Sequence, residues 1–373
     1  MALISGLDFS FFQPGISITL VRSTRPTRMD FSSNLDSFHG RSYPQVVSRL
    51  SNAAEAKVKL QGRKKGRKLI MNASFRETLE PFLDPTVEID WTNSDLPVSP
   101  IVERTPGLEA NCRYFGNLEW ASSYFKHCHR NERFRSRWTA ACGSWDDQVV
   151  VDIGCGPGNL FASLGGRPRL LLGVDISPGT LELARQVGYQ TVLADAHRLH
   201  FVPAFADIVV MNATLHHCDH MATVLAEAGR LVKPGGLFVS DHDPQRSAWD
   251  FRGPAKWAWD FRLKAYLWIK KGFHRSMEEQ TVALASEIHH EPGRGVTRAL
   301  YHETLEPLGF EVALFPHNHD LGREIFDGKI GRADRKYRVA QLLSGVNPNS
   351  PKAALSLFCR AVRRSLSPPL PVE

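Results

Sequence analysis

Cysteine and long apolar runs are both scarce in this chain. Only six of the 373 residues are Cys, too few to build the disulfide framework of a secreted scaffold. No run approaches the roughly 18 consecutive apolar residues of a membrane-spanning helix, so such a helix is excluded. The length and the 42% hydrophobic content suffice for a packed core in one large domain or two modest ones.

Most of the chain also lacks an excess of either positive or negative charge. The formal net charge is +7, a value that by itself suggests nucleic-acid binding. Residues 1–70, however, hold twelve Lys and Arg against four acids, whereas the other 303 residues hold 34 bases and 35 acids. The body is therefore almost neutral, and we do not expect nucleic acid to be its partner.

Residues 1–70 have the composition of a targeting segment. The first 52 residues contain ten Ser and only three acids, as organelle transit peptides do, and they lack the apolar core of a secretory signal. We expect a transit peptide or disordered leader over residues 1–70 and an organelle location, a chloroplast before a mitochondrion. The basic run at residues 62–68 also matches a nuclear-localisation or nucleic-acid patch, but we favour a solvated segment near a processing site.

The rest of the chain divides by its local patterns. Prolines punctuate residues 71–110, and aromatic clusters then predict one or two helices up to about residue 141. We assign residues 71–145 to an N-terminal extension, 146–364 to the main domain and 365–373 to a tail. Within the main domain, short apolar runs predict strands at 149–153, 170–174, 189–193, 208–211, 237–240, 310–315 and 354–361. Continuous apolar strands separated by helical patterns indicate an α/β fold with a parallel sheet covered on both faces.

The turn after the first predicted strand is the most informative motif. It reads Asp-Ile-Gly-Cys-Gly-Pro-Gly-Asn from residue 152. Its glycines let a ligand approach the backbone, and the following helix offers free N–H groups. A dinucleotide-binding turn would carry a third glycine where this chain has Asn159. Asp175 ends the second predicted strand, where a carboxylate can accept both ribose hydroxyls; Asp175 and Asp195 could instead be helix caps or turn residues.

Five ordered motifs between residues 148 and 243 resemble the class I S-adenosylmethionine-dependent methyltransferases, in particular the small-molecule, type 11-like branch. The motifs lie at residues 150–158, 173–177, 193–196, 207–217 and 231–239. The resemblance implies a Rossmann-like, seven-stranded, mostly parallel sheet with helices on both faces and an antiparallel last strand. It also implies S-adenosyl-L-methionine as the cofactor.

The resemblance assigns the cofactor's parts to particular residues. The methionyl group would lie beside the glycine turn and Asp152, the ribose at Asp175, and the adenine at Ile176 and Asp195. The complete set of cofactor-binding residues that it implies is Asp152, Gly154, Gly156, Gly158, Asp175, Ile176, Asp195, Ala196 and Asn212.

Candidate bases follow the fourth and fifth predicted strands, at the edge where ligands of open α/β sheets bind. They are His216, His217, Asp241 and His242, and a neutral His is a competent base for a phenol. We expect Asp219 to cap the next helix. We expect no metal site, because adjacent His residues on a strand end point to opposite sides and no C-x-x-C or H-E-x-x-H spacing is present.

An insertion at residues 245–300 interleaves aromatic and basic residues. Its residues Trp257, Phe261, Ala265 and Trp268 share one face of a predicted helix. We expect this aromatic face to pack on the core and the insertion to form a lid over an apolar acceptor. A peripheral contact with a membrane surface is an alternative.

The sequence therefore predicts an enzyme that transfers a methyl group to a small, lipophilic metabolite in an organelle. The alternatives are an RNA or protein methyltransferase and a non-catalytic scaffold with the same fold.

Overall fold

The computed structural model describes residues 75–93, 96–129, 131–269, 282, 285–287 and 293–365, without the side chains of 262–269. These residues belong to one compact unit. The predicted leader at residues 1–70 and nearly all of the predicted tail lie outside the described residues. Among the helices that the structure describes, none is long and apolar enough to cross a membrane.

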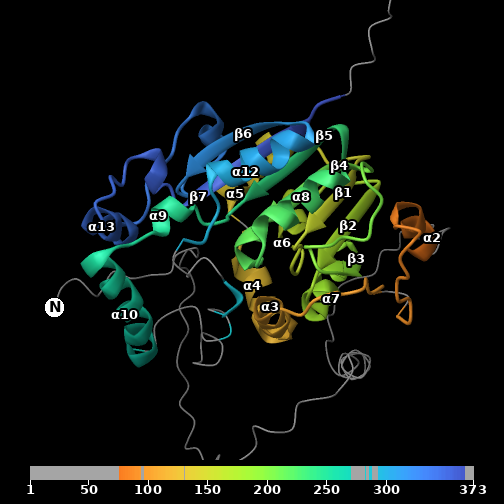
Figure 1. Ribbon diagram of the computed structural model, residues 1–373, viewed down its shortest axis with the longest axis horizontal. Coiled ribbons are helices and arrows are strands. Elements are labelled where there is room, and N and C mark those ends of the chain that lie inside the picture. Colours follow the sequence, from red (N-terminus) through yellow and green to blue (C-terminus); the bar gives the residue numbers. More distant parts are fainter. Residues whose placement is uncertain are drawn as a thin grey trace, which may run out of the picture. The chain divides into compact units, whose positions relative to one another are not determined.

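Seven strands form one sheet in the order β3-β2-β1-β4-β5-β7-β6 (Figure 1). Their bounds are β1 Val149–Ile153, β2 Leu170–Asp175, β3 Gln190–Leu193, β4 Ala206–Asn212, β5 Val232–Asp241, β6 Phe310–His317 and β7 Ser356–Arg363. Strands β1 to β5 are parallel, and β7 runs antiparallel to both β5 and β6. The predicted seven-stranded, mostly parallel sheet with an antiparallel last strand is confirmed.

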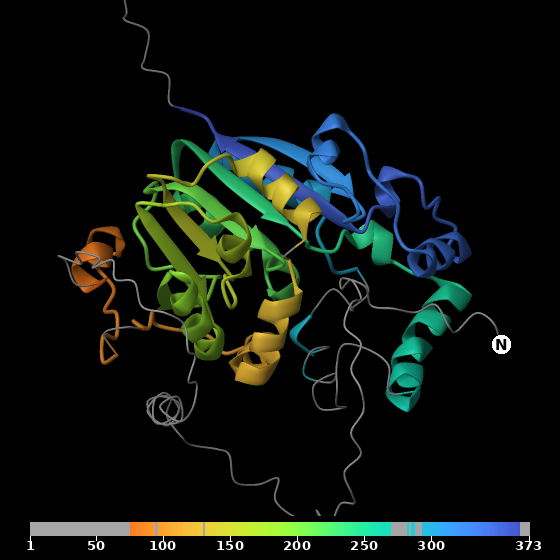
Figure 2. The same cartoon turned by 180° about the vertical axis from the view of Figure 1, so that it is seen from behind.

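Helices cover both faces of the sheet, as predicted. Helices α8 (Met221–Leu231) and α12 (Arg298–Leu305) lie over one face in Figure 1, and α5 (Glu132–Cys142) lies over the other in Figure 2. Every residue of β1 is buried as a result. Because side chains alternate along a strand, Val149, Val151 and Ile153 share the main apolar core.

Further helices in the described part of the main domain connect and flank the strands. They are α6 Asn159–Leu164, α7 Pro178–Val187, α9 Arg246–Trp249, α10 Gly253–Ile269 and α13 Arg335–Leu343, with 3₁₀ turns η2 Leu215–His217, η4 Glu306–Leu308, η5 Arg323–Asp327 and η6 Pro351–Ala353.

The N-terminal extension contains more helix than predicted. After α2 (Phe75–Leu79) and the 3₁₀ turn η1 (Glu80–Phe82), three helices follow where one or two were expected: α3 Pro106–Gly116, α4 Leu118–His127 and α5. Each is capped at its start, because the side chains of Thr105, Asn117 and Asn131 accept hydrogen bonds from the first-turn N–H groups. These short polar capping residues divide the segment into three.

The aromatic face predicted for the insertion does not pack on the core. On α10, Trp257 is 71% and Phe261 is 53% exposed, and their rings stack on each other. The helix instead buries its opposite side, where Trp259 contacts Tyr337 of α13 and the ring of Trp249. The prediction is therefore wrong for Trp257 and Phe261, whereas the side chains of Ala265 and Trp268 lie outside the described residues.

Candidate functional site

A pocket opens at the carboxyl ends of β1 to β4, with about 910 Å³ of open space. The chain order reverses between β1 and β4, and such a switch point is where open α/β sheets bind ligands. The residues that line it from the sheet are Asp152–Gly156, Val174–Ile176, Ala194–His197 and Asn212–Thr214, apart from Ile153. All the cofactor-binding residues predicted from the sequence except Gly158 thus lie around one pocket.

The three positions of the turn require glycine for different structural reasons. All adopt positive φ, at +69° for Gly154, +51° for Gly156 and +87° for Gly158. A Cβ on Gly154 would lie 2.3 Å from the Thr214 side chain, and one on Gly158 would lie 3.0 Å from the Tyr189 ring. A Cβ on Gly156 would meet no atom within 4 Å. Gly154 and Gly158 are therefore needed for packing, whereas Gly156 keeps pocket space open.

Two carboxyl groups stand beside this turn. Asp175 accepts hydrogen bonds from the backbone N–H groups of Gly156 and Ser177, each at 2.9 Å, yet burial outweighs these bonds and raises its pKa. Asp152 is 1% exposed and accepts a 2.7 Å hydrogen bond from the Tyr189 hydroxyl. Burial raises the pKa of Asp152 to about 7, so a nearby cation would favour its ionised form.

The turns after β3 and β4 complete the sheet side of the pocket. Asp195 accepts hydrogen bonds from the ring Nδ1 and the backbone N–H of His197, at 2.7 and 3.0 Å. Burial raises the pKa of Asp195, but these bonds outweigh it and hold the pKa below its ordinary value. The buried Oδ1 of Asn212 has no hydrogen-bond partner among the described residues. It is an acceptor that a ligand could use.

The opposite side of the pocket comes from the N-terminal extension, a part of the chain that none of the sequence motifs connects to the site. Leu108 and Phe115 of α3 and Tyr124 of α4 line it. Asn159 holds α4 there, since its side-chain amide donates to the carbonyl oxygens of residues 124, 125 and 128 at 3.4, 3.3 and 2.8 Å. The asparagine that interrupts the dinucleotide-type pattern therefore anchors a pocket wall. The aromatic clustering around Tyr114 and Tyr124 was the available signal.

The two adjacent histidines lie on the same side, contrary to the prediction. His216 and His217 belong to the 3₁₀ turn η2 rather than to a strand end, and their ring centroids are 4.1 Å apart. Only His217 lines the pocket, while His216 is buried against Asp243. One of the two reasons for expecting no metal site is therefore wrong.

Asp219 does not cap α8. That helix begins at Met221 after His220, with no side-chain cap. The Asp219 carboxylate instead accepts a hydrogen bond from the Thr105 hydroxyl at the start of α3, which ties the extension to the pocket rim.

Asp241 and His242 do not line the pocket. The fully buried Asp241 carboxylate bonds to Arg137 Nε of α5 at 3.3 Å and to His317 Nε2 of β6 at 2.8 Å. His242, whose φ is +64°, packs against the ring of His129. The sequence prediction of a catalytic role at these two positions is corrected, because both side chains belong to an internal polar network.

Residues 151–240 match a family model described as "Methyltransferase domain". The ubiquinone biosynthesis O-methyltransferase of Thiobacillus denitrificans is 32% identical over 123 residues, 31% of this chain and 53% of that protein. An uncharacterized methyltransferase of Mycobacterium bovis is 38% identical over 96 residues, 25% of this chain and 49% of that protein. The chain thus spans about half the length of these relatives.

Among solved structures, the chain also aligns with the geranyl diphosphate C-methyltransferase of Streptomyces coelicolor. It is 14% identical, with a TM-score of 0.43, and the match covers 71% of this chain and 100% of that one.

Proposed function

We propose, from the premise that residues 151–240 form a class I S-adenosylmethionine-dependent methyltransferase domain, that this protein methylates a small, lipophilic molecule. One observation carries the proposal: the turns after β1, β2, β3 and β4, each with its motif, converge on a single pocket. The organelle location stays a prediction from the composition of residues 1–70.

The residues of the pocket fit this cofactor. S-Adenosylmethionine, when bound, supplies an electrophilic methyl group on a sulfonium cation. Asp152, with its pKa near 7, would become a carboxylate beside that positive charge. Asp175 would hold the ribose hydroxyls, and the unpartnered Oδ1 of Asn212 would accept a further hydrogen bond. Gly156 leaves the space that a side chain would fill.

The wall formed by the extension supports a lipophilic acceptor. Leu108, Phe115 and Tyr124 present apolar surface to the pocket, and such surface holds an uncharged molecule and excludes water from the reacting groups. Holding donor and acceptor in line contributes on the order of 7–11 kcal/mol to such displacements. An apolar wall suits a small molecule better than RNA or a protein side chain.

Calorimetry with S-adenosylmethionine tests the proposal directly. The folded wild-type protein should bind one equivalent, and Asp175→Ala should weaken binding roughly 10- to 100-fold, as expected for the loss of charge-assisted hydrogen bonds. Asp327→Ala, at an exposed position, serves as the control. Absence of binding by the folded wild type would refute the proposed function, whereas unchanged affinity in Asp175→Ala would refute only the role of Asp175.

Two alanine substitutions in the glycine turn should separate ligand space from packing. Gly156→Ala should weaken cofactor binding more than about tenfold, with a stability loss of about 1 kcal/mol from the positive φ. Gly154→Ala forces a Cβ against Thr214 and should lower the free energy of unfolding by about 3 kcal/mol. Urea denaturation and calorimetry on both variants measure these effects. Equal stability of the two variants would show that Thr214 moves aside without cost.

A further inference from the structure

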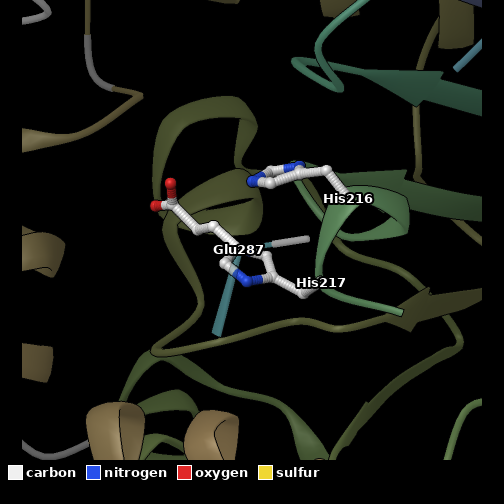
Figure 3. Close-up of side chains that lie close together, drawn as sticks. All are labelled: His216, His217 and Glu287. Carbon is white, nitrogen blue, oxygen red and sulfur yellow. The ribbon is translucent and has the colours of Figure 1, made fainter. Parts of the chain in front are cut away.

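Three side chains with metal-binding atoms meet beside the pocket. His216 and His217 come from η2, and Glu287 comes from the insertion (Figure 3). Their ligand atoms all lie within 4.8 Å of one another. Ligands of a tetrahedral zinc ion lie roughly 3.3 Å apart, given metal–ligand bonds of about 2.0–2.1 Å. Small rotations of the side chains would therefore bring the three around one ion.

The hydrogen bonds around both imidazoles favour this use. His216 Nδ1 lies 2.8 Å from an oxygen of Asp243, and His217 Nδ1 lies 2.6 Å from the backbone carbonyl oxygen of Ser286. A backbone carbonyl oxygen can only accept a hydrogen bond, and so can a carboxylate oxygen when the carboxyl group is ionised. The Nδ1 atom of each histidine is therefore the donor and carries the proton. Each Nε2 then keeps its lone pair, which is how outer carboxylates and carbonyls orient histidines toward a metal.

The buried carboxyl group of Asp243 also favours a cation at this place. Its carboxyl is completely buried, and its Oδ2 has no hydrogen-bond partner among the described residues. The other oxygen also accepts the backbone N–H of His216 at 3.1 Å. A buried carboxylate needs compensating positive charge, and a dication on the far side of the His216 ring would provide it.

We propose that His216, His217 and Glu287 form a site for one divalent transition-metal ion, with Zn²⁺ as the best match. Two imidazoles and one carboxylate suit Zn²⁺ and disfavour Mg²⁺ or Ca²⁺, which prefer oxygen ligands. Three protein ligands leave one coordination position open, as in catalytic zinc sites. His217 lines the pocket, so a bound ion would lie at the edge of the pocket.

The open coordination position indicates which chemical group of the methyl acceptor would be favoured. This inference rests on the proposed function. A hydroxyl group bound to such an ion would lose its proton to solvent water more easily at neutral pH. Its oxygen would then form the new bond to the methyl carbon as the bond to the sulfonium sulfur breaks and S-adenosylhomocysteine leaves. An acceptor with a hydroxyl group would therefore be favoured, and the two histidines would hold the ion rather than act as bases.

The test uses the full-length protein, freed of metal by chelation, and Zn²⁺ and Co²⁺ as probes. Titration calorimetry should show one equivalent of Zn²⁺ bound, and Co²⁺ should give the visible absorption of a four-coordinate nitrogen and oxygen site. Glu287→Gln and His217→Gln should each weaken binding more than about tenfold. The exposed residues His220 and Glu311 provide the matched controls His220→Gln and Glu311→Gln, which should leave binding unchanged.

Several outcomes would overturn the metal site. These are absence of stoichiometric binding by the folded wild type, binding by both site variants as tight as by the wild type, and a Co²⁺ spectrum dominated by thiolate ligands. Cofactor calorimetry on the same metal-free sample is a separate measurement. Zinc binding without S-adenosylmethionine binding would refute the proposed function alone, and the reverse result would refute the metal site alone.

Discussion

Replacing Arg137 by methionine should lower the free energy of unfolding by about 3–5 kcal/mol, because the substitution leaves a buried carboxylate without its cation. Arg137 is 1% and Asp241 0% exposed. The guanidinium also donates to the carbonyl oxygen of Leu321 at 2.5 Å. Burial raises the pKa of Asp241, but its contacts with His242 and His317 and the guanidinium of Arg137 outweigh burial and hold that pKa well below the ordinary value. Urea denaturation at pH 7 measures the loss.

A matched control lies on the same helix. Arg133 is exposed, so Arg133→Met should change stability by no more than about 0.5 kcal/mol. The double variant Arg137→Met with Asp241→Leu should recover part of the loss, since it removes the stranded charge together with its partner. If Arg137→Met were as stable as Arg133→Met, Asp241 would not be ionised in the folded protein.

Lowering the pH from 6.5 to 4 should destabilise the protein, with about 3 kcal/mol of the loss coming from His317. Its Nε2 donates to Asp241 at 2.8 Å, and its Nδ1 accepts the backbone N–H of His319 at 3.1 Å. A proton added to Nδ1 would oppose that N–H group. Burial, chiefly, lowers the pKa of His317 to about 4, from about 6.5 in an unfolded chain.

The direction of the effect follows from these two pKa values. Above pH 6.5, His317 is neutral in both states and its contribution to stability is complete. As the pH falls, the unfolded chain takes up a proton that the folded protein does not, so stability decreases by about 1.4 kcal/mol per pH unit until the folded pKa is reached. Burial also lowers the pKa of His129 and of His319, which adds to the loss in the same direction.

Denaturation curves between pH 4.5 and 7.5 measure this slope. The variant His317→Gln keeps a side-chain donor for Asp241 but cannot titrate. Its free energy of unfolding should therefore fall less steeply with decreasing pH, by the slope that corresponds to about one proton. Parallel losses of stability in the wild type and His317→Gln would show that His317 does not hold a lowered pKa.

The sequence alone determined the sheet and the side of the pocket that the sheet forms, because both depend on local patterns. Apolar runs such as 149–153 and 170–174 can be buried only as interior strands, and the glycines at 154, 156 and 158 permit a turn that other residues strain. Consecutive parallel strands place their carboxyl ends at one edge. Asp175 and Asp195 therefore had to lie near the glycine turn.

Only the tertiary structure decided what surrounds that pocket and how its polar groups are used. Asn159 anchors α4, the backbone carbonyl of Ser286 contacts the ring of His217, and Arg137 pairs with Asp241 in a buried network outside the pocket. Each of these contacts joins residues far apart in the chain, and the choice of partner depends on which elements pack together. Local periodicity and turn chemistry do not specify which distant elements pack together. The pocket's wall, the buried network and the His-His-Glu cluster can therefore be identified only in the folded structure.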